Sequence, residues 1–254
     1  MQSAGDSFAG MKIIELRTVD STNLYAAKLL NEENVEEGTV ITAKYQSAGK
    51  GYTGNTWSSE AEKNLLLSII LYPSFLFPSQ QFFLNQVVSL AVADTVEVFL
   101  QYSSVRIKWP NDIFADEKKI AGILIENKIH GPMLRHSIAG MGINVNQRKF
   151  SPELPHATSF FKIERMEFLL NEVMQELLSR LSKRYSQLKS WQMESMQKDY
   201  MKRLYRVEEA AWYVHSGKQF KGKIVGLTAQ GKLIIETGGI HEVFGFKEVE
   251  MILD

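Results

Sequence analysis

The pattern of apolar residues changes near residue 203, and this change constrains the fold more than any other feature of the sequence. Apolar side chains in residues 164–201 follow three- and four-residue steps, the period of an amphipathic helix packed on a core. From about Arg206 onward, short apolar runs alternate with glycine turns expected at residues 216–217, 222, 230–231 and 238–239, which is typical of a small β-barrel. The sequence therefore predicts two units, residues 11–203 and residues 204–254.

The first of these units mixes strand and helix patterns. Strands are expected at residues 11–19, 39–45, 65–71, 105–109 and 137–145, with a hairpin formed by residues 112–114 and 120–126. Helices are expected at residues 24–30, 82–101 and 164–201. Because the two kinds of element are interleaved irregularly, we expect an α+β fold with a mixed β-sheet flanked by helices.

Charge, cysteine content and apolar run lengths exclude several classes of protein. The 29 basic and 29 acidic residues give zero net charge, which argues against a nucleic-acid binder or a polybasic membrane patch. The absence of cysteine excludes disulfides and thiol nucleophiles and fits a reducing compartment. The longest apolar run, Leu65–Tyr72, is far shorter than the ~20 residues of a membrane span. Residues 1–10 are interpreted as a disordered lead-in without a signal peptide. We expect a cytoplasmic protein with neither nucleic-acid nor membrane partners.

A glycine-rich loop at residues 49–54 is the first candidate site. Its three glycines fit the G-x-G-x-x-G spacing, but no helix start follows and residues 69–74 contain no acid, so a dinucleotide-binding motif is disfavoured. Two interpretations stay open. The segment is either a mobile surface loop or a backbone cradle for a phosphate or carboxylate, to which Lys50 adds positive charge.

Three further motifs follow along the chain. The run Lys108–Asp112 (KWPND) is either an ordinary turn or a group of one cation and two oxygen-bearing side chains suited to phosphate and Mg²⁺. Lys119 lies across the predicted hairpin, and the small residue Gly122 leaves room for a ligand. Gly140 and Gly142 mark either the close approach of a ligand or a β-bulge. The H-E-x-x-H and G-x-S-x-G motifs are absent, which disfavours zinc proteases and serine hydrolases.

Taken in this order, the motifs resemble those of one family, the biotin–protein ligases. The resemblance runs from Asp20–Asn23 through residues 46–57, KWPND and Lys119–Gly122 to Gly140–Asn146, and covers about residues 12–254. It implies a sheet like that of class II aminoacyl-tRNA synthetases, followed by an SH3-like barrel. It also implies two steps: biotin and ATP give biotinyl-5′-AMP and pyrophosphate, and the acyl group then passes to a lysine of a biotin carboxyl carrier protein or domain. Since family members dimerise through sheet edges, a homodimer is an open alternative.

The resemblance also assigns roles to residues. Those expected to bind biotin are Ser21, Thr22, Asn23, Gln46, Gly49, Lys50, Gly51, Tyr52, Trp57, Lys119, Gly122 and Gly142. Those expected to bind ATP are Lys50, Asn55, Trp57, Lys108, Asn111, Lys119 and Asn144. Lys119 is expected to stabilise the charge that builds at phosphorus, an electrostatic role. Asp112 is expected to hold Mg²⁺ and is the residue to test as the base for the carrier lysine.

Three alternatives to a biotin ligase are weighed. Lipoate or octanoate protein ligases share the fold, but their R-R-x-G-G-G-x-V-x-H type motif is absent. A non-catalytic biotin sensor is disfavoured by Lys119 and the intact KWPND. A transcriptional repressor is disfavoured because only about ten residues precede the predicted catalytic start, so we expect the monofunctional class.

Tyr52 is a departure from the family pattern with a testable consequence. Bacterial relatives often read G-R-G-R-R-G-R here, whereas this chain reads G-K-G-Y-T-G-N, so a cationic donor credited with holding the adenylate is lost. We predict that biotinyl-AMP leaves this protein faster than it leaves an arginine-bearing relative. Stopped-flow release from the two proteins checks this, and equal rates would contradict it.

Overall fold

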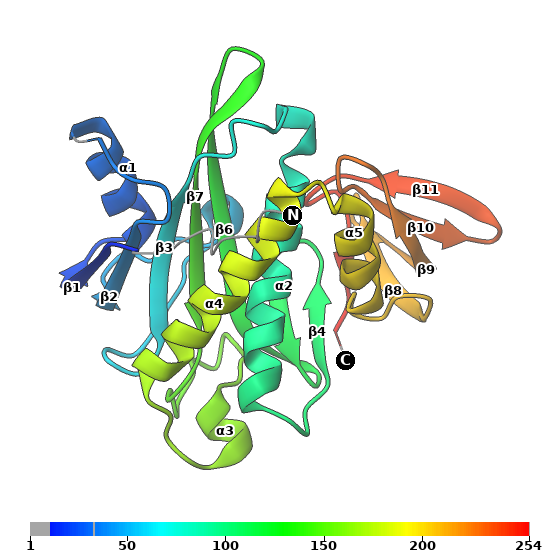
Figure 1. Ribbon diagram of the computed structural model, residues 1–254. Helices are drawn as coiled ribbons and strands as arrows, with labels where there is room; N and C mark the ends of the chain where they lie inside the picture. Colours follow the sequence, from blue (N-terminus) through cyan, green and yellow to red (C-terminus); the bar gives the residue numbers. More distant parts are fainter. Residues whose placement is uncertain (1–10, 33, 254) are drawn as a thin grey trace.

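The larger part of the protein is a mixed seven-stranded sheet in a computed structural model that describes residues 11–32 and 34–253 (Figure 1). The predicted lead-in, residues 1–10, lies outside the described residues. The strands follow the order β1-β2-β3-β7-β6-β5-β4, in which β1 and β2 are parallel and the other neighbours antiparallel. Their bounds are β1 Ile13–Val19, β2 Val40–Gln46, β3 Leu65–Leu71, β4 Val105–Lys108, β5 Asp112–Ala115, β6 Lys118–His130 and β7 Met133–Ile143. The expected α+β fold with a mixed sheet is therefore confirmed.

The helices divide between the two faces of this sheet. Their bounds are α1 Thr22–Glu32, α2 Phe82–Phe99, α3 Phe160–Glu164, α4 Leu170–Lys189 and α5 Met193–Lys202, with short 3-10 turns η1 Tyr52–Gly54 and η2 Pro78–Gln80. Side chains alternate between faces along a strand, so Leu67 and Ile69 of β3 join the main core with α2 and α4. Ile70 points the other way, into a small cluster with Ala26 of α1. The α1 face is thus left with open space beyond that helix.

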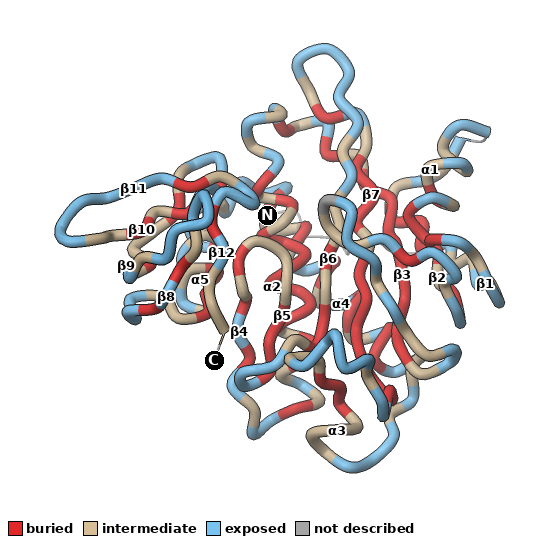
Figure 2. The backbone as a smooth tube through the Cα atoms, turned by 180° about the vertical axis from the view of Figure 1, so that it is seen from behind, coloured by how far each residue is buried: buried red, intermediate tan, exposed pale blue. Residues whose placement is uncertain are grey.

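Buried residues are concentrated in β3, β7, α2 and α4, and Figure 2 shows much of these central elements in red. Among the described residues, Pro78–Phe99 is one helix long and apolar enough to cross a membrane by length and composition, although 67% of it is buried within the protein. The sequence expectation considered only unbroken apolar runs and missed it. Because α2 packs on α4 and on β4–β6, its apolar surface serves as core.

The prediction of a single helix over residues 164–201 is wrong. The segment is broken at Arg165 and Trp191, whose φ angles of 60° and 58° are left-handed and end α3 and α4. The exposed Trp191 ring packs edge-on against Phe75, with 6.2 Å between centroids, which directs the chain from α4 into α5. The expected hairpin is confirmed as β5 paired with β6. The strand expected at residues 120–126 is longer than predicted, because β6 continues to a turn at Gly131 and pairs with β7 in a second hairpin that projects beyond the sheet (Figure 1).

The C-terminal residues form a five-stranded antiparallel sheet in the order β11-β10-β9-β8-β12. The strands are β8 Ala210–His215, β9 Lys218–Leu227, β10 Leu233–Thr237, β11 Ile240–Phe244 and β12 Glu250–Met251. The expected turns at residues 216–217 and 238–239 are confirmed, with φ angles of 49° and 75° and of 57° and 83°. The expected turn at Gly222 is wrong. This glycine lies inside β9, where a Cβ atom would collide with Ile235.

This second sheet is attached firmly to the first. The chain pairs with β4 as it leaves α5, because Ile107 donates to the carbonyl of Arg203 and accepts from the backbone of Tyr205 at 2.7 and 2.9 Å. At the other side of the junction, Trp109 Nε1 donates to the carbonyl of Gly231 at 2.9 Å, and the Phe82 ring packs directly against that glycine. One continuous apolar core extends from the large sheet into the small one.

Gly231 should therefore be intolerant of any side chain. Its φ of +80° disfavours other residues, and an added Cβ would overlap the Phe82 ring. Gly239 has almost the same φ, +83°, with nothing near its Cβ position. We predict that Gly231→Ala lowers the free energy of unfolding by about 1–3 kcal/mol more than Gly239→Ala, from overpacking alone. Urea denaturation of both variants measures the difference, and equal losses would show that the Phe82 contact does not matter.

Candidate active site

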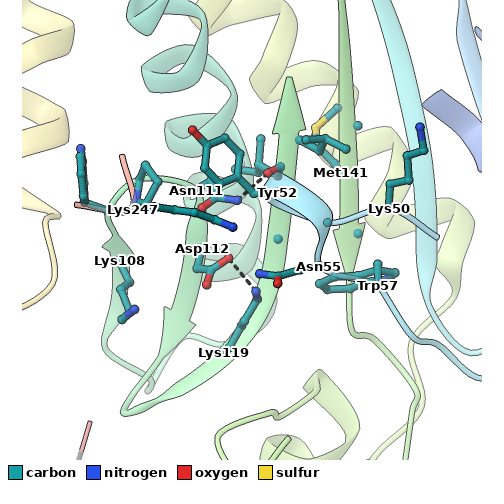
Figure 3. A pocket seen from close by; sticks show the side chains of 18 of the residues that line it. Lys50, Tyr52, Asn55, Trp57, Lys108, Asn111, Asp112, Lys119, Met141 and Lys247 are labelled. Atoms are coloured by element: carbon teal, nitrogen blue, oxygen red, sulfur yellow. Dashed lines mark hydrogen bonds and ion pairs between the residues drawn. The ribbon is translucent and has the colours of Figure 1, made fainter. Parts of the chain in front are cut away.

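A cavity of about 530 Å³ opens on the α1 face of the large sheet. Its floor comes from β5, β6 and β7, its edges from the start of α1 and the loop after β2, and its remaining wall from the C-terminal sheet. Figure 3 shows side chains of the glycine-rich loop, the KWPND turn and Lys247 of the C-terminal sheet directed around one space. Segments that are far apart in the sequence thus meet at one site.

Trp57 covers part of the cavity floor, and two glycines make this possible. Gly122 and Gly142 are direct partners in the β6–β7 pairing, so both present a bare backbone at one point. A Cβ atom on Gly142 would lie 2.5 Å from Trp57 Cε2, and one on Gly122 would lie 2.8 Å from Cζ3. The pairing continues regularly through Gly142, so of the two alternatives close approach is correct at this position. The group that approaches is the Trp57 indole.

One end of the cavity is a network of hydroxyl and amide groups. Thr22 donates its backbone N–H and its hydroxyl to Oε1 of Gln46, at 2.7 and 3.1 Å. The buried Ser68 hydroxyl donates to Oδ1 of Asn23 at 2.6 Å and lies 2.7 Å from Oγ1 of Thr22. Gly140 provides the space for the Asn23 side chain, because a Cβ atom there would overlap its amide. Since Oε1 of Gln46 is occupied, its Nε2 is left as a donor at the cavity wall.

The opposite end carries charge. Lys119 Nζ and Asp112 Oδ1 form an ion pair at 2.7 Å, and Lys119 also lies 5.8 Å from the centre of the Trp57 ring (Figure 3). Burial lowers the pKa of Lys108, an effect that nearby Asp112 opposes and Lys119 reinforces. Asn111 donates to the carbonyl of Ile123 at 2.8 Å, which fixes the turn against β6. The arrangement offers cations to a phosphate-bearing ligand, together with the carboxylates of Asp112 and Glu250.

Asp112 does not form a complete metal site by itself. Within the described part of the chain, there is no group of three or more His, Cys, Asp or Glu residues that could hold an ion. Mg²⁺ ordinarily completes its coordination with water and substrate phosphate oxygens. The residues present therefore fit Mg²⁺ only as an ion bound jointly by Asp112 and a phosphate ligand.

The glycine-rich loop is closed across its base. The backbone of Trp57 donates to the carbonyl of Gly49 at 2.8 Å, and Gly51 donates to that of Asn55 at 2.7 Å. Lys50 pairs with Thr56 in an isolated bridge between these bonds. The side chains of Lys50 and Asn55 stand at the cavity with those of Tyr52 and Trp57 (Figure 3).

Nearly all the residues selected from the sequence line this cavity. They are Ser21, Thr22, Asn23, Gln46, Lys50, Gly51, Tyr52, Asn55, Trp57, Lys108, Asn111, Asp112, Lys119, Gly122 and Gly142. Two selected residues are not part of the lining. Gly49 lies at the base of the loop, where a Cβ atom would collide with the carbonyl of Trp57. Asn144 is buried and donates to the carbonyl of Thr158 at 3.0 Å, so its visible role is to anchor the segment beside β6.

The sequence analysis missed the wall that the C-terminal sheet supplies. The lining residues from this part are Tyr205, Tyr213, Ile224, Leu233, Lys247, Val249, Glu250 and Met251. They share no spacing or motif, and they meet the cavity only because the second sheet packs against the KWPND turn. Ser68 was also missed, although a lone serine in the apolar run Leu65–Leu71 could have indicated a buried polar contact.

The cavity joins an amide and hydroxyl network at one end to a lysine–carboxylate pair at the other, which suits a ligand that carries both polar groups and a phosphate. Comparisons with known proteins identify the class of protein. Residues 15–144 match the model of the Biotin/lipoate A/B protein ligase family. The chain is 30% identical to the bifunctional ligase/repressor BirA of Bacillus subtilis, over 92% of this chain and 73% of the relative. It is 28% identical to the biotin–[acetyl-CoA-carboxylase] ligase of Mycobacterium tuberculosis, over 80% of this chain and 75% of that one.

Solved structures agree with the sequence comparisons. The biotin protein ligase from Aquifex aeolicus in complex with biotin and ATP superposes with a TM-score of 0.80 at 28% identity. The match covers 96% of this chain and 99% of that one. The chain belongs to the Biotin/lipoate A/B protein ligase family, and the resemblance to biotin–protein ligases seen in the sequence is confirmed.

Ser68 should contribute to stability through the polar network. In Ser68→Ala, the buried Oδ1 of Asn23 and hydroxyl of Thr22 each lose a partner, which should cost about 1–3 kcal/mol of unfolding free energy. Ser89 is a matched control, because it is equally buried but donates a longer hydrogen bond, 3.3 Å, to Oδ1 of Asn85 within α2. We expect little loss for Ser89→Ala in urea denaturation, and equal losses in the two variants would contradict the role of the network.

Proposed function

We propose that this protein attaches biotin to a lysine of a biotin carboxyl carrier protein or domain, using ATP and passing through biotinyl-5′-AMP. The observation that supports this most directly is the cavity itself. It joins the Thr22–Gln46 network to the Lys119–Asp112 pair, with Trp57 covering the floor between them. The Aquifex aeolicus ligase of similar fold binds both biotin and ATP.

Biotin is an uncharged bicyclic ring with an anionic tail, and the cavity has a counterpart for each part. Gln46 and Thr22, with Ser21 and Asn23 beside them, suit the polar ureido group of the ring. Trp57 provides an apolar surface for the tail, and Gly122 and Gly142 hold the indole flat against the sheet. In this proposal, Lys119 binds where the tail carboxylate meets the nucleotide, a role that its contacts with Asp112 and the Trp57 ring support.

The first step is attack of the biotin carboxylate on the α-phosphorus of ATP. A carboxylate O–P bond forms, the bond to the β-phosphate oxygen breaks, and pyrophosphate leaves with its electron pair. Lys119, assisted by Lys50 and Lys108, stabilises the negative charge that gathers at the phosphoryl oxygens. Asp112 would bind Mg²⁺ jointly with the phosphates, and the ion would supply further charge neutralisation.

The second step is attack of the carrier lysine amine on the acyl carbon. A C–N bond forms, the C–O bond to the phosphate of AMP breaks, and the amine loses a proton. No protein nucleophile is required, since the mixed anhydride is already activated. Asp112 lines the cavity in which the acyl carbon would lie, and it is the residue we propose to test as base for this proton.

The domain organisation, oligomeric state and location of the protein are further parts of the proposal. We infer that residues 11–203 act as the catalytic unit and that residues 204–254 act as an SH3-like barrel, supported by the five antiparallel strands. A homodimer would use an edge of the large sheet, and β1 is the better candidate, because residues 203–205 already pair with the other edge strand, β4. A cytoplasmic location without a nucleic-acid partner is supported by the zero net charge and the absence of cysteine.

A lipoate or octanoate protein ligase is the second candidate, because the matching family model includes both kinds of enzyme. The decisive assay incubates the protein with ATP, Mg²⁺ and an apo carrier domain, supplying biotin, lipoate or octanoate in turn. Mass spectrometry of the carrier domain shows which acyl group has been attached. We expect the mass increase of biotin and no increase with lipoate or octanoate. Transfer of octanoate or lipoate would support the second candidate, and biotin binding without any transfer would indicate a sensor.

Lys119 is expected to act on the first step more than on binding. Lys119→Gln should lower the rate of biotin-dependent ATP–pyrophosphate exchange by roughly 100- to 1,000-fold, the usual cost of removing one group that stabilises transition-state charge. Lys118 is the matched control, because it is the neighbouring residue on the same hairpin but is exposed and does not line the cavity. Lys118→Gln should exchange at the rate of the unaltered protein, and equal losses would contradict the assignment.

A further inference from the structure

One aromatic ring joins three segments that are distant in the sequence. Phe246, in the turn between β11 and β12, packs against Tyr52 of the glycine-rich loop with 6.0 Å between ring centroids and 79° between planes. It also lies 5.2 Å from the ring of Trp109 in KWPND and 6.1 Å from that of Phe82 in α2. We call these four residues the aromatic latch.

The turn that carries Phe246 is held rigidly. Glu248 accepts a hydrogen bond from the backbone of Gly245 and returns one from its own backbone N–H to the Gly245 carbonyl at 3.2 Å. The carbonyl of Glu248 also contacts Nδ1 of His215 in β8. Lys247 adopts a left-handed φ of 64°, a conformation that costs energy outside glycine and persists where surroundings enforce it. The ring of Phe246 is therefore fixed to the C-terminal sheet.

The latch lies along the cavity wall. Tyr52 and Trp109 line the cavity, and so do Lys247 and Val249, the residues on either side of Glu248. Among these contacts, the Tyr52–Phe246 pair is the one that joins the glycine-rich loop to the C-terminal sheet. The other two rings that touch Phe246 belong to the large sheet and its helix, and they would hold the C-terminal turn whether or not the loop were closed.

We propose that the edge-to-face contact of Tyr52 with Phe246 retains biotinyl-AMP by closing the glycine-rich loop onto the C-terminal sheet. The inference rests on the proposed function and names two positioning residues for it. Tyr52 stands where relatives often have an arginine, so retention here depends on contact between two parts of the protein. Such a contact acts on departure of the intermediate, because the loop must separate from Phe246 before the bound adenylate can leave.

The test is a double-mutant cycle on the release of biotinyl-AMP. Tyr52→Ala and Phe246→Ala should each raise the release rate about 2- to 10-fold, the range expected for loss of one aromatic pair. The double variant should release no faster than the faster single variant, because both changes remove the same contact. Tyr52→Phe keeps the ring and should release at the original rate. The affinity for biotin alone, measured by calorimetry, should change less than twofold in Phe246→Ala, because Phe246 does not line the cavity.

Controls separate this inference from the proposed function and from folding. Trp212→Ala removes an exposed ring from β8 of the same sheet and should leave release unchanged. Phe246→Leu replaces Phe246→Ala if the alanine variant does not fold. Failure of the unaltered protein to form biotinyl-AMP overturns the proposed function. Formation of the adenylate with release rates that are unchanged, or that multiply in the double variant, overturns the latch alone.

Discussion

The site depends on one close contact, the Trp57 indole lying on bare backbone at Gly122 and Gly142. This contact fixes the glycine-rich loop over β6 and β7. It thereby also fixes the polar network at one end of the cavity relative to the Lys119–Asp112 pair at the other. The network around Gln46 begins the loop, and Trp57 ends it beside Lys119. A methyl group on either glycine would lift the indole and separate the two ends of the cavity. The two glycines are therefore required by the Trp57 side chain of the same protein. Their effect on a ligand is indirect, through the position of that indole.

The two faces of the large sheet have different roles, one in stability and the other in ligand binding. The α2–α4 face carries the main core, with β3 completely buried, and this rigidity is what allows the other face to hold polar groups in fixed positions. Ser68 shows how the two requirements meet in one strand. It is buried among apolar residues of β3, yet its hydroxyl orients Asn23 and Thr22 at the cavity. Polar groups placed this way lose little entropy when a ligand binds, because they are already ordered.

Most of the site could be predicted from the sequence because its residues occur in compact motifs. The glycine-rich loop, KWPND and Lys119–Gly122 each place several lining residues within a few positions of one another, and the strands that carry them follow clear patterns. The break at Trp191 could not be predicted, since the helical period continues on both sides and only the contact with Phe75 shows the bend. The cavity wall formed by the C-terminal sheet could not be predicted from the sequence for a similar reason. Lys247 and Val249 reach the cavity through the packing of one sheet on another, which leaves no periodic trace.

The order in which the cavity is assembled along the chain has a consequence for synthesis on the ribosome. The polar network uses residues up to Ser68, the charged end uses residues up to Lys119, and the last wall residue is Met251. A nascent chain therefore holds the substrate-recognition groups long before it can enclose anything between them. Enclosure waits until the segment that ends at Met251 has been made. A ligase built in this order gains a closed chamber for a reactive acyl phosphate only after the C-terminal sheet has been added to the large one.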